Sequence, residues 1–549
     1  MNKYDINPVV DENLYSAMAI VSDALGSLNN GAIDHGVFFE DDMVDALTLI
    51  YECDQPQYQR IRVELKNVLS ISAIERLIKE NTGSRNDKPS QADELVNLVK
   101  NDLELFHDEE KIAFATIHIN GHEETYLIDS SSFYEWLSVS AYKKLNHCPS
   151  ELTIRSTQQT LSAMARFEGK EIKPFLRVAN YKNGYVIDIG DCDWRVIVIS
   201  PNRWEIRDVS PVKFWRNNNM RSLPIPNKNG SLKALWELLN IQKKDKIFIL
   251  NFIFECWRND TEFPILELIG EQGTAKSTTQ SILRKFIDPN KVALRAAPKN
   301  IEDLFVSASQ NWLASYNNLS YLKPDMQDAF CILSTGGGHS TRKLYTNNEE
   351  SVIDVSRPCI INGISGIATA QDLLDRVIRL ELQPIKSFTP QSELDKIIKK
   401  ESSGIFGGLL DRFCKVLSFL PKAQELPVKD RMADFVKLGE ALCYSFGKQP
   451  KFEKVYRANK TISITQAIEA SPAIMAIDKI VRNRPFNGTY ARLLSKIKYN
   501  YLSYDLPKSA KGLADLLKRQ APALRKIGIK CTHHKQRKND GYHVSIQKI

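Results

Sequence analysis

The sequence predicts a multidomain α/β protein. Three observations support this fold class. An apolar strand, a glycine-rich turn and a helix follow one another within residues 264–287. Apolar strands and helices alternate from about residue 232 onward. The chain ends in helices followed by two strands, the order of a winged helix. The length of 549 residues allows about three to five domains of roughly 100–200 residues each.

The composition is that of a globular protein, with 43% hydrophobic and 26% charged residues. The nine cysteines stand singly, without a C-x-x-C pair, and no signal peptide stands in front. This pattern favours free thiols in a reducing compartment. The longest apolar run, "KIFILNFIFECW", contains an Asn and is shorter than the roughly 20 residues of a membrane span. We therefore expect a cytoplasmic protein without a membrane anchor.

Charge is distributed unevenly along the chain, although the net charge is only +8. Residues 1–60 hold 11 Asp and Glu against Lys3 and Arg60, a net charge of −9. Residues 488–549 hold 14 Lys and Arg against three Asp, a net charge of +11. So dense a basic excess in a patterned segment favours nucleic-acid binding over the alternative, an ordinary solvated surface.

Residues 1–90 are predicted to form an acidic helical domain. "DENLYSAMAIVSDAL" and "YQRIRVELKNVLSISAIERLIKE" carry apolar residues at helical spacing. "NTGSRNDKPSQ" (81–91) is polar and contains Gly and Pro, which predicts a linker.

Residues 91–231 are predicted to form a β-rich domain. Asn120-Gly121 and Asn183-Gly184 each join two alternating runs, as in β-hairpins. "DWRVIVIS" and "RWEIRDV" add strands, and "SLPIPNKNGS" (222–231) is a linker.

Three further regions follow in the second half of the chain. Residues 232–395 have the alternating pattern of an α/β core, and residues 396–480 are mostly helical. Residues 486–549 are predicted to be a winged helix. There "GTYARLLSKIKYNYL" gives the first helix, "AKGLADLLKRQAPALRKIG" the next helices, and "IKCTHHKQRKNDGYHVSIQKI" two strands joined by a basic turn.

The strongest functional motif is "LELIGEQGTAKSTTQSIL", residues 266–283. A phosphate-binding loop reads G-x-x-x-x-G-K-[ST], and here Ala275 takes the place of the second Gly. Because Ala adds only a methyl group and can begin a helix, we expect the loop to cradle the phosphates of ATP. Lys276 would reach the β and γ phosphates, and Ser277 would hold Mg²⁺. The expected nucleotide-binding residues are Gly270, Glu271, Gln272, Gly273, Thr274, Ala275, Lys276, Ser277 and Thr278.

Further strands are expected to complete this site. In "NWLASYNNLSYL", Asn317 and Asn318 stand where acids that bind Mg²⁺ belong. In "PCIINGI", Asn362 is placed to sense the γ-phosphate. In "DLLDRVIRLEL", Arg376 is suited to reach the nucleotide of a neighbouring subunit. The alternative for Arg376 is an ion pair with a nearby aspartate on the same helix.

These motifs together carry a family resemblance. "GEQGTAKST" resembles the Walker A motif of the minichromosome maintenance helicases, which also read Ala-Lys-Ser. "YNNLSYL", "LSTGGGHSTRKLYTNNEE", "RPCIINGI", "DLLDRVIRLEL" and "RMADF" resemble the AAA+ replicative helicases of phages and mobile elements, including those of staphylococcal cassette chromosomes. The resemblance covers most of the chain from about residue 90 to the end.

The resemblance implies an AAA+ phosphate-loop core that binds ATP and Mg²⁺, in a hexameric ring. It implies the roles of Lys276 and Ser277 in Walker A, Asn317 and Asn318 in Walker B, Asn362 as sensor 1, Arg376 as arginine finger and, by context alone, Arg431 as sensor 2.

One position departs from the family, which usually reads Asp-Asn before Leu-Ser. Asn317 takes the Asp position, and an amide cannot replace the charge of a carboxylate beside Mg²⁺. Slow hydrolysis or rescue by another acid are both open. The candidate acids are Asp325, Asp328, Glu349 and Glu350.

Two regions are expected to contact DNA. The resemblance implies that a hairpin at residues 335–350 enters the ring channel and grips single-stranded DNA through Arg342, Lys343 and Tyr345. An ordinary loop is the alternative. The winged helix is expected to contact DNA, with duplex DNA as a candidate, mostly at phosphates, or else to dock a protein. Its candidate residues are Lys518, Arg519, Arg525 and Lys526, with Lys535, Arg537 and Lys538 on the wing.

Three functions remain open. The favoured one is a hexameric ATP-driven helicase for the replication of a mobile element. The second is an initiator that recognises an origin and uses ATP only to assemble, an alternative that Asn317-Asn318 keeps open. The third is a primase–helicase, in which Asp41, Asp42 and Asp45 of the head would bind metal, although the preferred interpretation is that they are first-turn acids favoured by the helix dipole. We expect no zinc at Cys531, His533 and His534, which lack a partner cluster.

Overall fold

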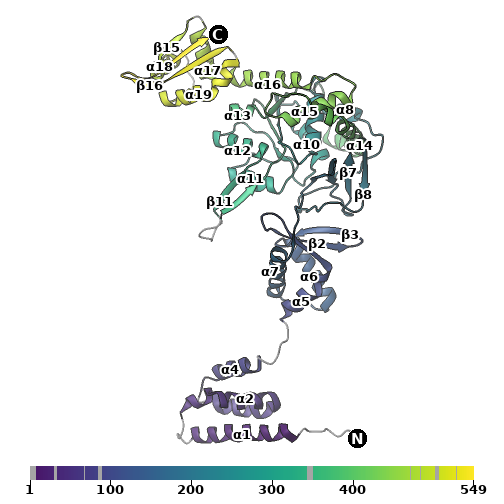
Figure 1. The fold of residues 1–549 in the computed structure, drawn as a ribbon, viewed down its shortest axis with the longest axis vertical. Helices are drawn as coiled ribbons and strands as arrows, with labels where there is room; N and C mark the ends of the chain where they lie inside the picture. Colours follow the sequence, from purple (N-terminus) through teal and green to yellow (C-terminus); the bar gives the residue numbers. More distant parts are fainter. Residues whose placement is uncertain are drawn as a thin grey trace. The chain divides into compact units, whose positions relative to one another are not determined.

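The chain forms two compact units in the computed structural model. Their helices and strands are drawn in Figure 1. One contains residues 1–99 and 140–157, and the other contains residues 100–139 and 158–549. The structure describes residues 8–29, 34–66, 69–83, 90–342, 350–469, 471–482, 484–500, 506–526 and 528–549. Among these, no helix is both long and apolar enough to cross a bilayer. The mixed α/β multidomain class predicted from the sequence is confirmed.

The first unit begins with a helical cluster, as predicted. Its elements are α1 (Pro8–Asn29), η1 (His35–Phe39), α2 (Asp41–Cys53), α3 (Gln55–Lys66), α4 (Ile71–Gly83) and α5 (Gln91–Val99). Val21, Phe38, Leu47 and Ile50 are fully buried in the core that α1, η1, α2, α3 and α4 share. Asp41 and Asp42 lie in the first turn of α2, where the helix dipole favours acids.

Two antiparallel-rich sheets precede the central core. The first has the order β3-β2-β1-β4 and the second β5-β6-β7-β8. Their strands are β1 (Leu103–His107), β2 (Ala113–Ile119), β3 (His122–Leu127), β4 (Lys170–Glu171), β5 (Val178–Tyr181), β6 (Gly184–Asp188), β7 (Val196–Ser200) and β8 (Arg203–Arg207). The predicted hairpin at Asn120-Gly121 is confirmed, with φ of 50° and 87° at the two turn residues.

Two predictions for this region need correction. The second hairpin turns one residue earlier, because Tyr181 pairs with Gly184 and leaves Lys182 and Asn183 in the turn. Gly184 lies within the sheet, where a Cβ would be 2.0 Å from the carbonyl oxygen of Ile199. The region predicted as β-rich also contains the helices α5, α6 (Ser131–Leu145) and α7 (Glu151–Phe167).

The central sheet is entirely parallel, in the order β10-β13-β9-β14. Its strands are β9 (Ile265–Ile269), β10 (Ala314–Tyr316), β13 (Cys359–Gly363) and β14 (Val377–Glu381). The strands are almost wholly buried, as expected for a parallel sheet covered on both faces. Around it lie α8 (Lys233–Leu238), α9 (Lys246–Glu255), α10 (Lys276–Ile287), α11 (Ile301–Ser309), α12 (Pro324–Thr335) and α13 (Gln371–Leu374).

Helices follow the sheet, as predicted for residues 396–480. They are α14 (Gln391–Gln424), α15 (Ala433–Ser445), α16 (Phe452–Glu469) and α17 (Pro472–Val481).

The C-terminal part contains two helices and a three-stranded sheet of order β15-β17-β16. Its elements are β15 (Phe486–Thr489), α18 (Tyr490–Asn500), α19 (Ala510–Lys526), β16 (Ile529–Lys538) and β17 (Gly541–Lys548). The segment in which further helices were expected forms the single helix α19, because Leu513, Leu517 and Leu524 all lie on one buried face.

Candidate nucleotide site

The glycine-rich loop connects the carboxyl end of β9 to the first turn of α10. Gly270 and Gly273 have φ of 149° and 80°. A Cβ on Gly270 would lie 2.6 Å from the carbonyl oxygen of Leu382, so this position requires glycine. Ala275, the N-cap of α10, has a left-handed φ of 57°, which costs an L-residue about 1 kcal/mol. The predicted strand–turn–helix geometry is therefore present, with strain at the Ala that replaces Gly.

Lys276 folds back over this loop. Its Nζ donates to the carbonyl oxygens of Gly270 and Glu271, both at 2.7 Å, and lies 3.2 Å from Thr274 Oγ1. Partial burial lowers the pKa of the Lys276 amine, because the ammonium loses water. An anion placed in the loop would supply the missing negative charge, so the residues fit a phosphate group.

Three of the predicted site residues meet at the carboxyl edge of the sheet. Ser277 Oγ donates to Asn317 Oδ1 at 2.7 Å, and Asn362 Nδ2 donates to the same oxygen at 2.7 Å. The backbone N–H of Asn318 donates to Asn362 Oδ1 at 2.8 Å. The side-chain oxygen of Asn317 thus accepts two hydrogen bonds, as one oxygen of an aspartate would.

Gln280 belongs to this group but was not predicted. It is fully buried on α10, one turn after Ser277. Its Nε2 donates to Ser315 Oγ at 2.9 Å and to the carbonyl oxygen of Tyr316 at 3.1 Å, and its Oε1 accepts from Asn362 Nδ2.

The two candidate acids whose side chains are described, Asp325 and Asp328, do not join this group. Within the described residues, the hydrogen bonds of Ser277, Asn317 and Asn362 include no carboxylate. Asp325 is exposed on α12, where it accepts a hydrogen bond from the next backbone N–H. The charge of Asp328 acts on the thiol of Cys331, away from the loop. Glu349 and the side chain of Glu350 lie outside the described residues.

Arg376 lies at the opposite edge of the sheet from the loop. Its carbonyl oxygen accepts from the N–H of Ile265, the first residue of β9, at 2.9 Å. The five residues of β9 separate this edge from the loop by about 16 Å. Arg376 is only 5% exposed. Its Nη1 donates to the carbonyl oxygen of Asp372, and its Nε has no hydrogen-bond partner among the described residues.

Arg431 lies beside Arg376. Its Nη1 is 3.8 Å from Asp372 Oδ1, and its side chain is 47% exposed. The predicted sensor 2 residue is therefore brought to the amino edge of the sheet and not to Lys276. The buried Arg376 and the exposed Arg431 therefore both lie at the amino edge of the sheet. From this edge they cannot contact a nucleotide in the glycine-rich loop of their own chain.

A buried ion pair joins the neighbouring strands β9 and β14 in the middle of the sheet, between these two edges. Glu267, in the middle of β9, is fully buried and pairs with Arg379 Nε on β14. Arg379 Nη1 also donates to the carbonyl oxygen of Ser463 on α16 at 3.2 Å. Asn459 on α16 exchanges two hydrogen bonds with the backbone of Arg379. The loop strand and α16 are thereby held by one polar network.

The predicted DNA contacts are partly described. β11 (Gly338–Arg342) and β12 (Glu350–Asp354) form an antiparallel pair, so the predicted hairpin exists as far as the structure describes it. Arg342 is the last residue of β11, and Lys343 and Tyr345 lie outside the described residues.

The basic residues of the C-terminal part are exposed where their side chains are described. Lys518, Arg519 and Arg525 are exposed on α19, and Arg537 is exposed on β16. The side chains of Lys526, Lys535 and Lys538 lie outside the described residues. His533 contacts the hydroxyl of Tyr490, and His534 Nε2 lies 2.9 Å from Ser545 Oγ.

Comparison with known proteins identifies related families. Residues 232–459 match the profile of the actinomycete integrative conjugative element replication protein, and residues 472–549 match the profile of the C-terminal domain of the same replication protein, RepA. Together the two matches span more than half of the chain. No curated protein matches it.

Among solved structures, "SCCmec type IV Cch - active helicase" matches with a TM-score of 0.43 at 13% identity, covering 81% of this chain and 93% of that chain. The apo C-terminal region of NrS-1 matches with a TM-score of 0.37 at 13% identity, covering 83% of this chain and 99% of that chain. Both likenesses are distant.

Proposed function

We propose that this chain, whose residues 232–459 and 472–549 match the profiles of a replication protein of actinomycete integrative conjugative elements, is an ATP-driven DNA helicase with an AAA+ core. The observation that carries the proposal is the meeting of Ser277, Asn317 and Asn362 at the end of the glycine-rich loop. These residues come from three separate parts of the sequence. A polar cluster next to a helix N-terminus is what a bound triphosphate and its metal ion require.

The residues around the loop divide the work of binding. The backbone N–H groups of the loop and Lys276 would hold the phosphates, and Ser277 with Asn317 would hold Mg²⁺. When bound, Mg²⁺ neutralises charge on the β and γ phosphates. Asn362 would orient the attacking water or sense the γ-phosphate, and Gln280 fixes its amide through the Oε1 contact.

The arginines at the far edge of the sheet support action between subunits. Arg376 and Arg431 lie about 16 Å from the loop of their own chain, so their charge would serve the nucleotide of a neighbour in a ring. Arg431, which is exposed and weakly paired, is the one free to move toward that nucleotide. The hairpin β11–β12 would grip one DNA strand, and the C-terminal helices and sheet, as a winged helix, would bind DNA phosphates through the basic face of α19.

A strand-separation assay tests the proposal. A forked DNA duplex is incubated with the full chain, ATP and Mg²⁺, and release of the labelled strand is followed. We expect release with the wild type and none with Lys276→Ala or without ATP. If the wild type binds the fork but releases no strand at any ATP concentration, the helicase assignment is wrong.

A second function is favoured by one observation, the amide at position 317. The chain would then be an ATP-binding initiator that assembles on an origin with little or no hydrolysis. This alternative predicts ATP-dependent assembly on duplex DNA, unchanged when ATP is replaced by a non-hydrolysable analogue.

A further inference from the structure

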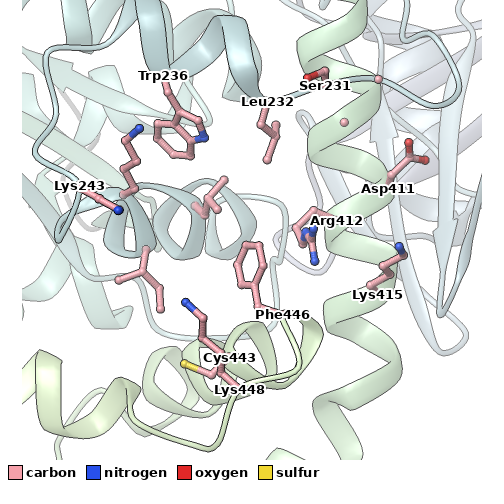
Figure 2. A pocket seen from close by; sticks show the side chains of 15 residues that line it. Ser231, Leu232, Trp236, Lys243, Asp411, Arg412, Lys415, Cys443, Phe446 and Lys448 are labelled. Carbon is pink, nitrogen blue, oxygen red and sulfur yellow. The ribbon is translucent and has the colours of Figure 1, made fainter.

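The second unit contains a basic cavity of about 590 Å³ between α8, α9, α14 and α15. None of the loop residues 270–278 lines it, whereas Ser277 and Thr278 line a separate cavity of about 320 Å³. The size of the basic cavity lies within the range of small-molecule binding sites. Figure 2 shows Trp236 on one side of the hollow and Arg412 with Phe446 on the other.

The charge of this cavity is strongly positive. Its cationic lining residues are Lys243, Lys246, Arg412, Lys415 and Lys448. Within the described chain, none of the five forms an ion pair. Asp411 is the one acid of the lining, and its Oδ1 accepts from Trp204 Nε1 at 2.7 Å. Five cations face one carboxylate, so the lining has a formal net charge of +4.

Aromatic rings and a carbonyl oxygen hold two of these cations. The Arg412 guanidinium carbon lies 4.1 Å from the centroid of Phe446, and Arg412 Nη1 donates to the carbonyl oxygen of Ser445 at 2.8 Å. Lys246 Nζ lies 4.8 Å from the centroid of Trp236. Ring faces attract cations without neutralising their charge, so both groups stay available to an anion. Burial lowers the pKa of Arg412, as expected for a cation that lacks a counter-charge.

We propose that this cavity binds a ligand that carries several phosphate groups. The shared chemistry is a set of phosphate oxyanions, supplied either by a free nucleoside polyphosphate or by the phosphodiester backbone of single-stranded DNA. Several fixed cations around one hollow favour an anion of several charges over a single carboxylate. Contact with the ring of Phe446 orients the planar guanidinium of Arg412 so that it can bind two phosphate oxygens. The proposal does not depend on ATP hydrolysis at the glycine-rich loop.

The test uses the full chain carrying Lys276→Ala, so that the loop contributes as little as possible to binding. The pocket variant adds Lys243→Ala, Lys415→Ala and Lys448→Ala, all exposed positions whose loss is not expected to disturb folding. The matched control instead adds Lys244→Ala, Lys429→Ala and Lys454→Ala, which remove the same charge from exposed positions outside the cavity. Binding of tripolyphosphate is measured by calorimetry, and binding of a labelled twenty-nucleotide dT strand by anisotropy.

We expect the pocket variant to lose about tenfold or more in affinity for at least one probe, and the control to change far less. Loss for tripolyphosphate assigns the cavity to a free polyphosphate. Loss for the strand assigns it to DNA, and the slope of log affinity against log salt should then fall by about 2, since each phosphate contact contributes about 0.7. Equal behaviour of the pocket variant and the control with both probes overturns the proposal.

Discussion

Asn317 is the residue on which the chemistry of the loop site depends. Its side-chain oxygen accepts hydrogen bonds from Ser277 and Asn362, and in the proposed site this oxygen would take the place of a metal-binding carboxylate oxygen. What differs from an aspartate is the missing negative charge. Mg²⁺ is bound mainly by charged and hydrated oxygens, so in the proposed site the amide would weaken metal binding without changing the shape of the site.

The first prediction concerns this charge. Asn317→Asp should leave the fold unchanged, because the two side chains have the same shape and both hydrogen bonds to the oxygen can remain. It should lower the Mg²⁺ concentration needed for half-maximal ATP turnover by about tenfold, the effect of roughly 1.4 kcal/mol of added metal binding. Titration of ATPase activity with Mg²⁺ measures this, and Asn300→Asp, at the exposed N-cap of α11, is the control. An unchanged Mg²⁺ dependence would show that position 317 does not contact the metal.

Ala275 gives a second prediction at the same scale. Because Ala275 has a φ of 57°, Ala275→Gly should stabilise the protein, by up to about 1 kcal/mol. At Ala514, within α19, the same change should destabilise it by about 1 kcal/mol. Calorimetric unfolding of the two variants should therefore show shifts of opposite sign. A decrease in stability for both variants would mean that residue 275 is not left-handed in solution.

At the scale of elements, one buried ion pair fastens the loop strand β9 to β14 and, through β14, to α16. Arg379 contacts Glu267 in the sheet and Ser463 in the helix. The arrangement gives α16, the helix that precedes α17 in the sequence, a direct polar connection to the strand that ends at the glycine-rich loop.

The third prediction follows from this burial. Arg379→Ala leaves the carboxylate of Glu267 buried without its partner, so the free energy of unfolding should fall by about 3–5 kcal/mol. Arg76→Ala removes the exposed pair with Glu80 and should leave the free energy of unfolding almost unchanged, because water screens the pair. Denaturant titration compares the two variants. Similar small losses for both would mean that the pair is not buried in solution.

The two arginines at the amino edge of the sheet, Arg376 and Arg431, give the fourth prediction. Arg431→Ala should reduce ATP turnover by about 10³-fold if this charge completes a neighbour's site. Mixing inactive Arg431→Ala subunits with inactive Lys276→Ala subunits should restore part of the activity, since some interfaces then contain both intact residues. Absence of recovery in mixtures that do assemble would place Arg431 outside the site of its neighbour.

At the scale of the whole molecule, the sequence predicted what depends on local pattern. The alternation of strands and helices, the turn at Asn120-Gly121 and the loop before α10 all follow from short-range signals. It did not predict what depends on distant contacts. The turn before Gly184 depends on the close approach of Ile199. The position of Arg431 depends on its contact with Asp372. The role of Gln280 depends on its hydrogen bond with Asn362.

The proposal of an ATP-driven motor is best tested by measuring steady-state ATP turnover, with and without single-stranded DNA, for the wild type and for the Lys276→Ala variant. We predict turnover that DNA stimulates and that Lys276→Ala abolishes. The cluster around Ser277, Asn317 and Asn362 would then be a working motor site. Tight ATP binding with negligible turnover, whether or not DNA is present, would contradict it and leave the chain as an ATP-dependent initiator.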